Sequence, residues 1–332
     1  MTAARDARLD SILTAQPKEA WQGVFEKLWE VFSPPVSSQH AEREITERER
    51  KISELELLLC GSAWELWRDF EISIPHTAQS LIEFWNNTPS GRAVLILDAL
   101  SLRESPWLLQ EAQRRGYRIH QSGVRGGEIP SDTICFAKAL GFGQRSSLEN
   151  NGAGSAHYLS GARTESMNAA WDYCLDWIAS ARDIALWHHW PDERIHQLAE
   201  PGGDFQKLYR EASQQLTSDS FWNMVERMAT GRRLVITSDH GYAVCGMFAN
   251  VSDKEQVGWL KTNFGSSRFS NGPSTAHHWV PPISLCLEST HGKNQFVLGR
   301  RKWHSAGGYP TLAHGGLSLL EVIVPFIEIS KS

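Results

Sequence analysis

Acidic and histidine side chains follow several short apolar runs in this sequence. Asp98 comes directly after AVLIL, and Asp239 and His240 come directly after RLVITS. A carboxylate at the end of a buried strand costs free energy unless a cation or a hydrogen-bond donor meets it. Carboxylate oxygen and imidazole nitrogen are common ligands of divalent metal ions. These three residues therefore predict a metal site where the strands end.

Two further segments carry the same types of ligand. Asp192 and His196 are four residues apart in WPDERIHQL, so they share one face if the segment is a helix, and Pro191 suits a helix start. His314 precedes two glycines, which let the backbone approach a ligand closely. Each residue alone also has a structural interpretation, as a helix cap, a turn former or a core histidine. Their combination in one chain favours the metal site.

Thr133 carries a hydroxyl group at the start of an expected helix, where a nucleophile could lie. It follows Pro130, Ser131 and Asp132 and precedes ICFAKAL, a pattern that predicts a helix beginning near Thr133. The positive end of the helix dipole stabilises phosphate and a deprotonated hydroxyl group. The alternatives are a first-turn residue without a chemical role, and Ser131 as the nucleophile.

The elements that would position these side chains alternate between strands and helices from residue 93 onward. Helical segments such as ESMNAAWDYCLDWIAS and DFQKLYREASQQLTSDSFWNMVERMA separate strand-like runs, which are AVLILDAL, YRIHQSGV, IALWHHW, RLVITSD, ISLCLES, NQFVLGRR and EVIVPFIEI. This alternation predicts an α/β fold, with an open sheet flanked by helices on both faces. Ligands bind such sheets at the carboxyl ends of the parallel strands. The segment NNGAGSAHYLSGARTES predicts a mobile loop.

Residues 1–90 are expected to form a helical N-terminal appendage to a catalytic domain at 91–332. The charged stretch AEREITERERKISELELLL predicts a solvated amphipathic helix. Four of the 14 tryptophans lie in AWQGVFEKLWEVF and AWELWRDF. We interpret them as the packing faces of amphipathic helices, and a base-stacking or partner-binding surface is the alternative.

The bulk composition, with 41% hydrophobic and 21% charged residues, is that of a globular protein. A net charge of −5 argues against coating nucleic acid through bulk positive charge. No apolar run approaches the roughly 20 residues that span a bilayer, and the N-terminus lacks the apolar core of a signal peptide. Five scattered cysteines without a CxxC pair suggest neither a disulfide framework nor a thiolate zinc site. A cytoplasmic protein fits best.

Four blocks of the sequence resemble the PglZ branch of the alkaline phosphatase superfamily. They are VLILDALSLRE, EIPSDT, VITSDHG and HGGLSLLEVIVP, the last of which is close to the C-terminal signature of PglZ domains. The segment WHHWPDERIH is similar to the Asp-x-x-x-His block of the wider superfamily. The resemblance covers roughly residues 90–330 and implies an alkaline-phosphatase-like sheet.

The resemblance also implies roles for individual residues. One metal would be held by Asp192, His196 and His314. The other would be held by Asp98, Asp239 and His240, with the Thr133 oxygen bound to it as nucleophile. Nitrogen and carboxylate ligands suit two divalent ions, zinc first and manganese as the alternative. Two ions about 4 Å apart would clamp the phosphate group.

Three further residues are candidates for substrate binding. Arg103 lies five residues after Asp98 and is suited to a bidentate contact with a phosphoryl oxygen. His157 lies in the expected loop, and Arg301 belongs to the basic run Arg300-Arg301-Lys302 ahead of His314. Each has the alternative of a surface or structural residue. We expect one of His188 and His189 either to face the site or to have a structural role at the end of the sheet.

The function that the resemblance implies is a metal-dependent phosphohydrolase. A phosphodiesterase or nuclease is preferred because PglZ relatives include both, and PglZ domains occur in phage-defence systems such as BREX. A phosphomonoesterase is one alternative. Another is a degenerate scaffold module that binds defence proteins, or a second copy of the chain, through the N-terminal helices.

Overall fold

The computed structural model describes residues 12–89, 91–178, 181–201, 203–245, 250–272, 279–305 and 308–331. Its centre is a six-stranded sheet in the order β2-β13-β5-β1-β4-β3. The strands are β1 (Arg92–Leu97), β2 (Arg118–Gly126), β3 (Arg163–Met167), β4 (Ile184–His188), β5 (Arg233–Thr237) and β13 (Ile323–Ser330). Within this sheet, β13 runs antiparallel to both of its neighbours, and β5, β1, β4 and β3 are parallel. The predicted mixed α/β architecture is confirmed.

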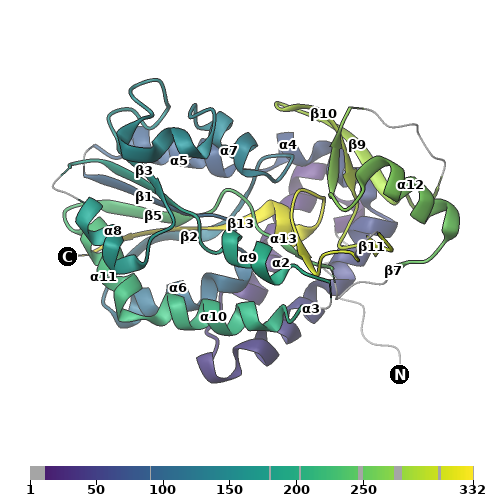
Figure 1. Cartoon of the computed structure of the whole chain (residues 1–332), viewed down its shortest axis with the longest axis horizontal. Helices are drawn as coiled ribbons and strands as arrows, with labels where there is room; N and C mark the ends of the chain where they lie inside the picture. Colours follow the sequence, from purple (N-terminus) through teal and green to yellow (C-terminus); the bar gives the residue numbers. More distant parts are fainter. Residues whose placement is uncertain are drawn as a thin grey trace.

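Both faces of the sheet are buried, as the continuous apolar runs predict. Side chains alternate between the two faces of a strand. In β1, Val94 and Ile96 pack beneath α5 (Thr77–Asn87) and α7 (Thr133–Ala139). Leu95 and Leu97 face the opposite layer, where the helices are α6 (Ser105–Arg114), α8 (Trp171–Trp177), α10 (Gln206–Thr217) and α11 (Asp219–Ala229). The two helical layers lie above and below the sheet in Figure 1.

A smaller region follows β5 in the chain and lies apart from the main sheet (Figure 1). It contains α12 (Lys254–Phe264) and a three-stranded antiparallel sheet of β8 (Phe269–Asn271), β10 (Gly292–Val297) and β9 (Ser284–Ser289). The runs ISLCLES and NQFVLGRR therefore form strands as predicted, but not in the main sheet. Two short pairs complete the region, β7 (Asn250–Val251) with β11 (Lys302–Trp303), and β6 (Ala243–Val244) with β12 (Leu312–Ala313).

The N-terminal region is helical, as predicted. Its main helices are α2 (Pro17–Phe32) and α3 (Ala41–Gly61), followed by η2 (Trp64–Asp69), α4 (Phe70–Ser73) and α5. Trp21, Trp67 and Trp85 are buried, which confirms the packing interpretation for these tryptophans. The apolar faces of α2 and α3 share one hydrophobic cluster with β9, β10 and residues 317–323. The N-terminal helices thus cover the C-terminal segment of the chain.

A buried charge network joins α3 to the rest of the fold. Glu49 lies between Arg103 and Arg300, and none of these three side chains is more than 1% exposed. Arg300 also pairs with Glu56, whose other oxygen accepts the backbone N–H of Leu319 at 2.8 Å. The interpretation of this charged helix as fully solvated is therefore wrong for Glu49 and Glu56. Their charges are neutralised by partners that lie far away in the sequence.

The segment before β3 also differs from expectation. Residues 163–167 were divided between the expected loop, which ended at Ser166, and the expected helical segment, which began at Glu165; they form the edge strand β3 beside β4. The long helical segment after residue 204 is divided at Ser218 into α10 and α11. None of the described helices combines the length and the apolar character needed to cross a bilayer. All five cysteines lie in the described residues, and all are free thiols.

Candidate functional site

The carboxyl ends of β1, β4 and β5 meet at one edge of the sheet and bring Asp98 and Asp239 together. The backbone N–H of Ala99 donates to Asp239 Oδ1 at 3.0 Å, and the N–H of Asp98 donates to the carbonyl of His188 at 3.0 Å. Ser238 Oγ donates to the carbonyl of Leu97 at 2.8 Å, which ties the end of β5 to the end of β1. Asp98 and Asp239 are fully buried. Adjacent parallel strands therefore hold two carboxylates side by side.

Thr133 is the first residue of α7, as the sequence predicts. Asp132 caps the helix by accepting the N–H of Ile134 at 2.8 Å. Thr133 Oγ1 lies 2.9 Å from Asp239 Oδ2, 3.4 Å from Asp98 Oδ1 and 3.4 Å from His240 Nε2. Ser131, the alternative nucleophile, is buried, and its Oγ accepts the backbone N–H of Gly315 at 3.1 Å. Of the two hydroxyl groups, Thr133 is the one in contact with the paired carboxylates.

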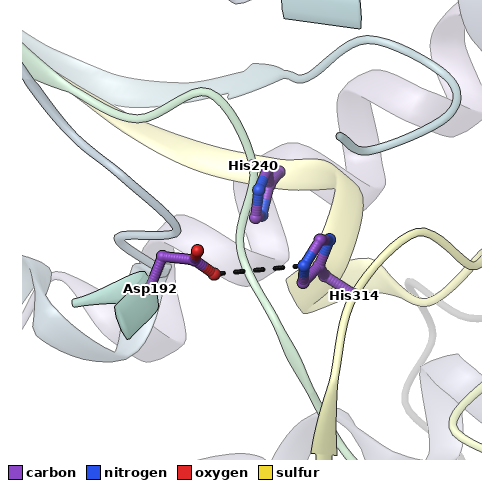
Figure 2. A group of neighbouring side chains, drawn as sticks. All are labelled: Asp192, His240 and His314. Carbon is purple, nitrogen blue, oxygen red and sulfur yellow. Dashed lines mark ion pairs between the residues drawn. The ribbon is translucent and has the colours of Figure 1, made fainter. Parts of the chain in front are cut away.

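His240 and His314 stack on each other with ring centroids 4.2 Å apart, and Figure 2 shows them facing Asp192. His240 Nδ1 lies 2.9 Å from the carbonyl of Gly241, and His314 Nδ1 lies 3.2 Å from the carbonyl of Ser131. These carbonyls accept a hydrogen bond from Nδ1–H, so each Nε2 is the nitrogen that faces the other site residues. This is the arrangement that prepares histidine to bind a metal ion.

Asp192 begins α9 (Asp192–Leu198), and its backbone N–H donates to the carbonyl of Asp98 at 3.0 Å. Its Oδ2 lies 3.3 Å from His196 Nε2, as the spacing of four residues predicts. Its Oδ1 lies 3.9 Å from His314 Nε2 and has no hydrogen-bond partner although it is buried. His196 lies on the outer side of this carboxylate, with 63% of its side chain exposed. A ligand role for His196 stays a prediction.

The loop that carries His314 is held by a buried ion pair. Arg268 Nε lies 2.5 Å from Glu321 Oε1, and neither side chain is exposed. Glu321 also accepts the N–H of Gly316 at 3.0 Å. Gly315 has φ +101°, and an added Cβ would lie 2.7 Å from Phe269, so this position requires glycine. The HGGLSLLE segment thus fixes His314 by its two glycines and its glutamate.

Two groups of three side chains in the described residues place ligand atoms close enough to hold a metal ion. One is Asp98, Asp239 and His240, and the other is Asp192, His240 and His314. His240 belongs to both. The buried Asp192 Oδ1 without a hydrogen-bond partner, and the two imidazoles whose Nε2 atoms face the carboxylates, fit a divalent cation. Carboxylate and imidazole donors without thiolate suit zinc or manganese.

The raised pKa values of Asp98 and His240 also indicate that the site favours bound positive charge. Burial, together with the charges of Asp239 and Asp192, raises the pKa of Asp98 well above its ordinary value. Burial disfavours a charged His240, but Asp239, Asp98 and Asp192 outweigh this effect and raise its pKa to about 9. His240 therefore holds a second proton at neutral pH when no metal is bound. A bound cation would replace that proton.

We expect metal binding to release protons and to weaken as the pH falls. Below pH 9 a metal ion must displace the proton of His240, so affinity should fall by up to about tenfold per pH unit from this group alone. Calorimetric titration with Zn²⁺ in buffers of different ionisation enthalpy would count the released protons. An affinity that stayed constant between pH 6 and pH 8 would contradict this prediction.

Sequence reasoning missed one residue at the site. Arg145 begins the 3-10 segment η4 (Arg145–Asn151) and forms an ion pair with Asp98 Oδ2. It lies between the expected Thr133 helix and the expected loop, and no motif marks it. His189 faces Glu193, with Nδ1 3.5 Å from a carboxylate oxygen. His188 is buried against Trp171, as a sheet-end residue.

The three residues that were predicted to bind substrate make other contacts in the structure. Arg103 is fully buried, with Nε 2.6 Å from Glu49, so its guanidinium is engaged in the charge network. His157 is buried beside Phe142, with ring centroids 4.8 Å apart. Arg301 donates to the carbonyl of Pro282 at 2.9 Å and is partly buried, so it is not part of a solvated basic patch. A phosphate-binding role does not fit these positions.

The part of the chain that carries most of the site residues and the HGGLSLLE segment matches a known protein family. Residues 156–329, just over half of the chain, match the model of the BREX system PglZ alkaline phosphatase-like domain. The chain belongs to the PglZ family. The PglZ match includes Asp192, His196, Asp239, His240 and His314. The segments with Asp98 and Thr133 lie before its start, so their assignment to the candidate site rests on the geometry described above and not on the family match.

Two solved structures similar to this PglZ protein are a murine ectonucleotide pyrophosphatase/phosphodiesterase 5 and a phosphonoacetate hydrolase from Sinorhizobium meliloti in complex with phosphonoformate. The first has a TM-score of 0.43 and 11% identity, over 73% of this chain and 88% of that chain. The second has a TM-score of 0.37 and 12% identity, over 73% and 90%. Both scores are low, so membership of the PglZ family rests on the sequence match. No curated protein matches the chain in sequence.

Proposed function

We propose that this PglZ protein is a phosphohydrolase that cleaves phosphodiesters, nucleotides or nucleic acid among them, with Thr133 as nucleophile and two divalent ions as cofactors. The observation that supports this most is the position of Thr133 Oγ1, within 3.4 Å of Asp98, Asp239 and His240. A hydroxyl group placed among the members of a potential ligand group is suited to become a nucleophile.

The residues of the chain account for the steps of the reaction. Thr133 Oγ1 attacks phosphorus and forms a phosphothreonine ester, while the bond to the leaving-group oxygen breaks. Asp239 Oδ2, at 2.9 Å, accepts the hydroxyl proton, which finally leaves with the departing group. Water then cleaves the ester and restores the threonine. Divalent ions, when bound, would lower the pKa of the hydroxyl and stabilise the charge on the phosphoryl oxygens.

A diester is preferred over a monoester because of the surroundings of Thr133. Ile134, the next residue in the chain, is 52% exposed, and we propose that it contacts the organic group that a diester retains.

Comparison of two model esters would test the proposal. With Zn²⁺ or Mn²⁺ bound, we expect kcat/KM for bis-p-nitrophenyl phosphate to exceed that for p-nitrophenyl phosphate by about tenfold or more. The reverse order would favour a phosphomonoesterase of the same superfamily. Absence of turnover of both esters, together with absence of stoichiometric metal in the purified protein, would favour a scaffold module instead.

The family also suggests a setting for this activity. Because the matching domain is described from BREX systems, we propose a role in anti-phage defence with other proteins of such a system. The N-terminal helices carry exposed apolar side chains, Leu57 at 59% and Ile72 at 84%, and are the proposed surface for a partner or a second copy. Phage plating on cells with wild-type or Thr133→Ala protein would test whether any protection requires the catalytic site.

A further inference from the structure

Arg145 pairs with one oxygen of the Asp98 carboxylate, and the other oxygen faces the candidate metal centre. Its Nη1 pairs with Asp98 Oδ2. The other oxygen, Oδ1, faces the centre, 3.4 Å from Thr133 Oγ1 and 3.7 Å from His240 Nε2. A ligand role of Oδ1 and an ion pair at Oδ2 are therefore compatible. Arg145 has no need to leave Asp98 when a cation binds.

The segment that carries Arg145 is firmly attached to the sheet. Leu148 is fully buried in the cluster beneath α5 and α7, and its carbonyl accepts the hydroxyl of Thr164 at 3.1 Å. The N–H of Asn150 donates to both oxygens of Glu165 at 3.0 and 3.1 Å. Thr164 and Glu165 belong to the edge strand β3. The base of the Arg145 side chain is thus fixed at the sheet, and only 26% of the side chain is exposed.

An anionic substrate also needs hydrogen-bond donors at this site. Ionised Asp98, Asp192 and Asp239 accept hydrogen bonds and donate none, while divalent ions, when bound, would offset their charge. Among the ion pairs in the described parts of the chain, Arg145 is the arginine or lysine that reaches these carboxylates. A guanidinium has five N–H donors in a planar fork, so donors remain after one has bound Asp98.

We propose that Arg145 is a substrate-binding residue of the phosphohydrolase, whose free guanidinium N–H groups bind a non-bridging oxygen of the phosphoryl group beside Thr133. The ion pair with Asp98 orients the planar guanidinium group of Arg145. This inference rests on the proposed function and adds a residue that no motif of the sequence indicates. The chemistry it recognises is a phosphoryl oxyanion, in a diester or in inorganic phosphate.

Binding of inorganic phosphate to the metal-loaded protein tests this directly. We expect Arg145→Ala to weaken phosphate binding, measured by calorimetry, about 10- to 100-fold, and Arg145→Lys to retain part of the affinity because it keeps the charge but loses the fork. For bis-p-nitrophenyl phosphate, kcat/KM of Arg145→Ala should fall about 100-fold. Metal content should stay at the wild-type level.

The matched control is Arg163→Ala. Arg163 begins β3, at the end of the strand away from the site, and its guanidinium lies 5.2 Å from the centre of the Trp177 ring. It should bind phosphate as the wild type does. Equal phosphate affinity of Arg145→Ala and wild type, or loss of metal from Arg145→Ala, would overturn the inference. If the wild type cleaves no ester, the proposed function fails, and phosphate affinity still decides the role of Arg145.

Discussion

Replacing Thr133 with alanine is expected to lower turnover of bis-p-nitrophenyl phosphate by roughly 10⁴-fold or more, because the variant lacks the attacking oxygen. The hydroxyl is the group that touches Asp98, Asp239 and His240. None of these three depends on it for its position, since Asp239 accepts the N–H of Ala99 and His240 is oriented by the carbonyl of Gly241. Initial rates at saturating metal would measure the loss.

Two controls separate catalysis from folding. Thr133→Ser keeps a hydroxyl at the start of α7 and should retain measurable turnover. Thr133→Ala should bind close to the wild-type amount of metal, because the carboxylates and imidazoles remain in place. Wild-type activity in Thr133→Ala would show that another group attacks phosphorus.

The largest effect on stability is expected from Glu49→Gln. This change leaves Arg103 and Arg300 buried without their shared counter-charge, which typically costs about 3–5 kcal/mol in the free energy of unfolding. Chemical denaturation monitored by tryptophan fluorescence would measure it. Glu54→Gln is the matched control, because Glu54 lies on the exposed side of the same helix and should change stability by less than about 0.5 kcal/mol.

The pH dependence of stability gives a second test of the same group. Burial opposes the charge on Glu49, but Arg103 and Arg300 outweigh it and lower its pKa from 4.5 to about 2. A lowered folded-state pKa means that the stabilisation is complete above pH 4.5 and is lost as the pH falls from 4.5 towards 2. In this range the wild type should lose stability more steeply than Glu49→Gln. Parallel pH profiles would contradict the prediction.

Much of the sheet could be predicted because its strands are buried on both faces. The runs that became β1, β4 and β5 are short, apolar and bounded by turn-forming residues, and each leads into a polar residue. The opposite direction of β13 could not be predicted, since an apolar run such as IVPFIEI does not show which way it crosses a sheet. The strand β3 was missed because RTESM is polar, as suits an edge strand beside a loop.

Contacts in the site between residues close together in the sequence could be predicted. Contacts between distant segments were harder to predict. Asp192 and His196 are in contact because one helix holds them, and spacing alone indicates this. Arg145 and Asp98 meet across 47 residues, which no local pattern reveals. Arg103 was predicted to bind phosphate because it lies five residues after Asp98, and no local pattern reveals that its partner is Glu49. Positions 45, 49, 52, 56 and 59 nevertheless form one stripe at helical spacing, and the charges at 49 and 56 belong to that stripe.

The buried charge network has a consequence for the order of events during synthesis. Glu56 contacts Arg300, which is 244 residues later, and the backbone of Leu319, which is 263 residues later. At roughly 5–20 residues per second, helix α3 leaves the ribosome about 10–50 s before these partners exist. Through that interval Glu56 lacks its native partners, although α2 and Arg103 are already available to pack against α3. The part of the native core around Glu56 can therefore close only when residues 300–319 have emerged.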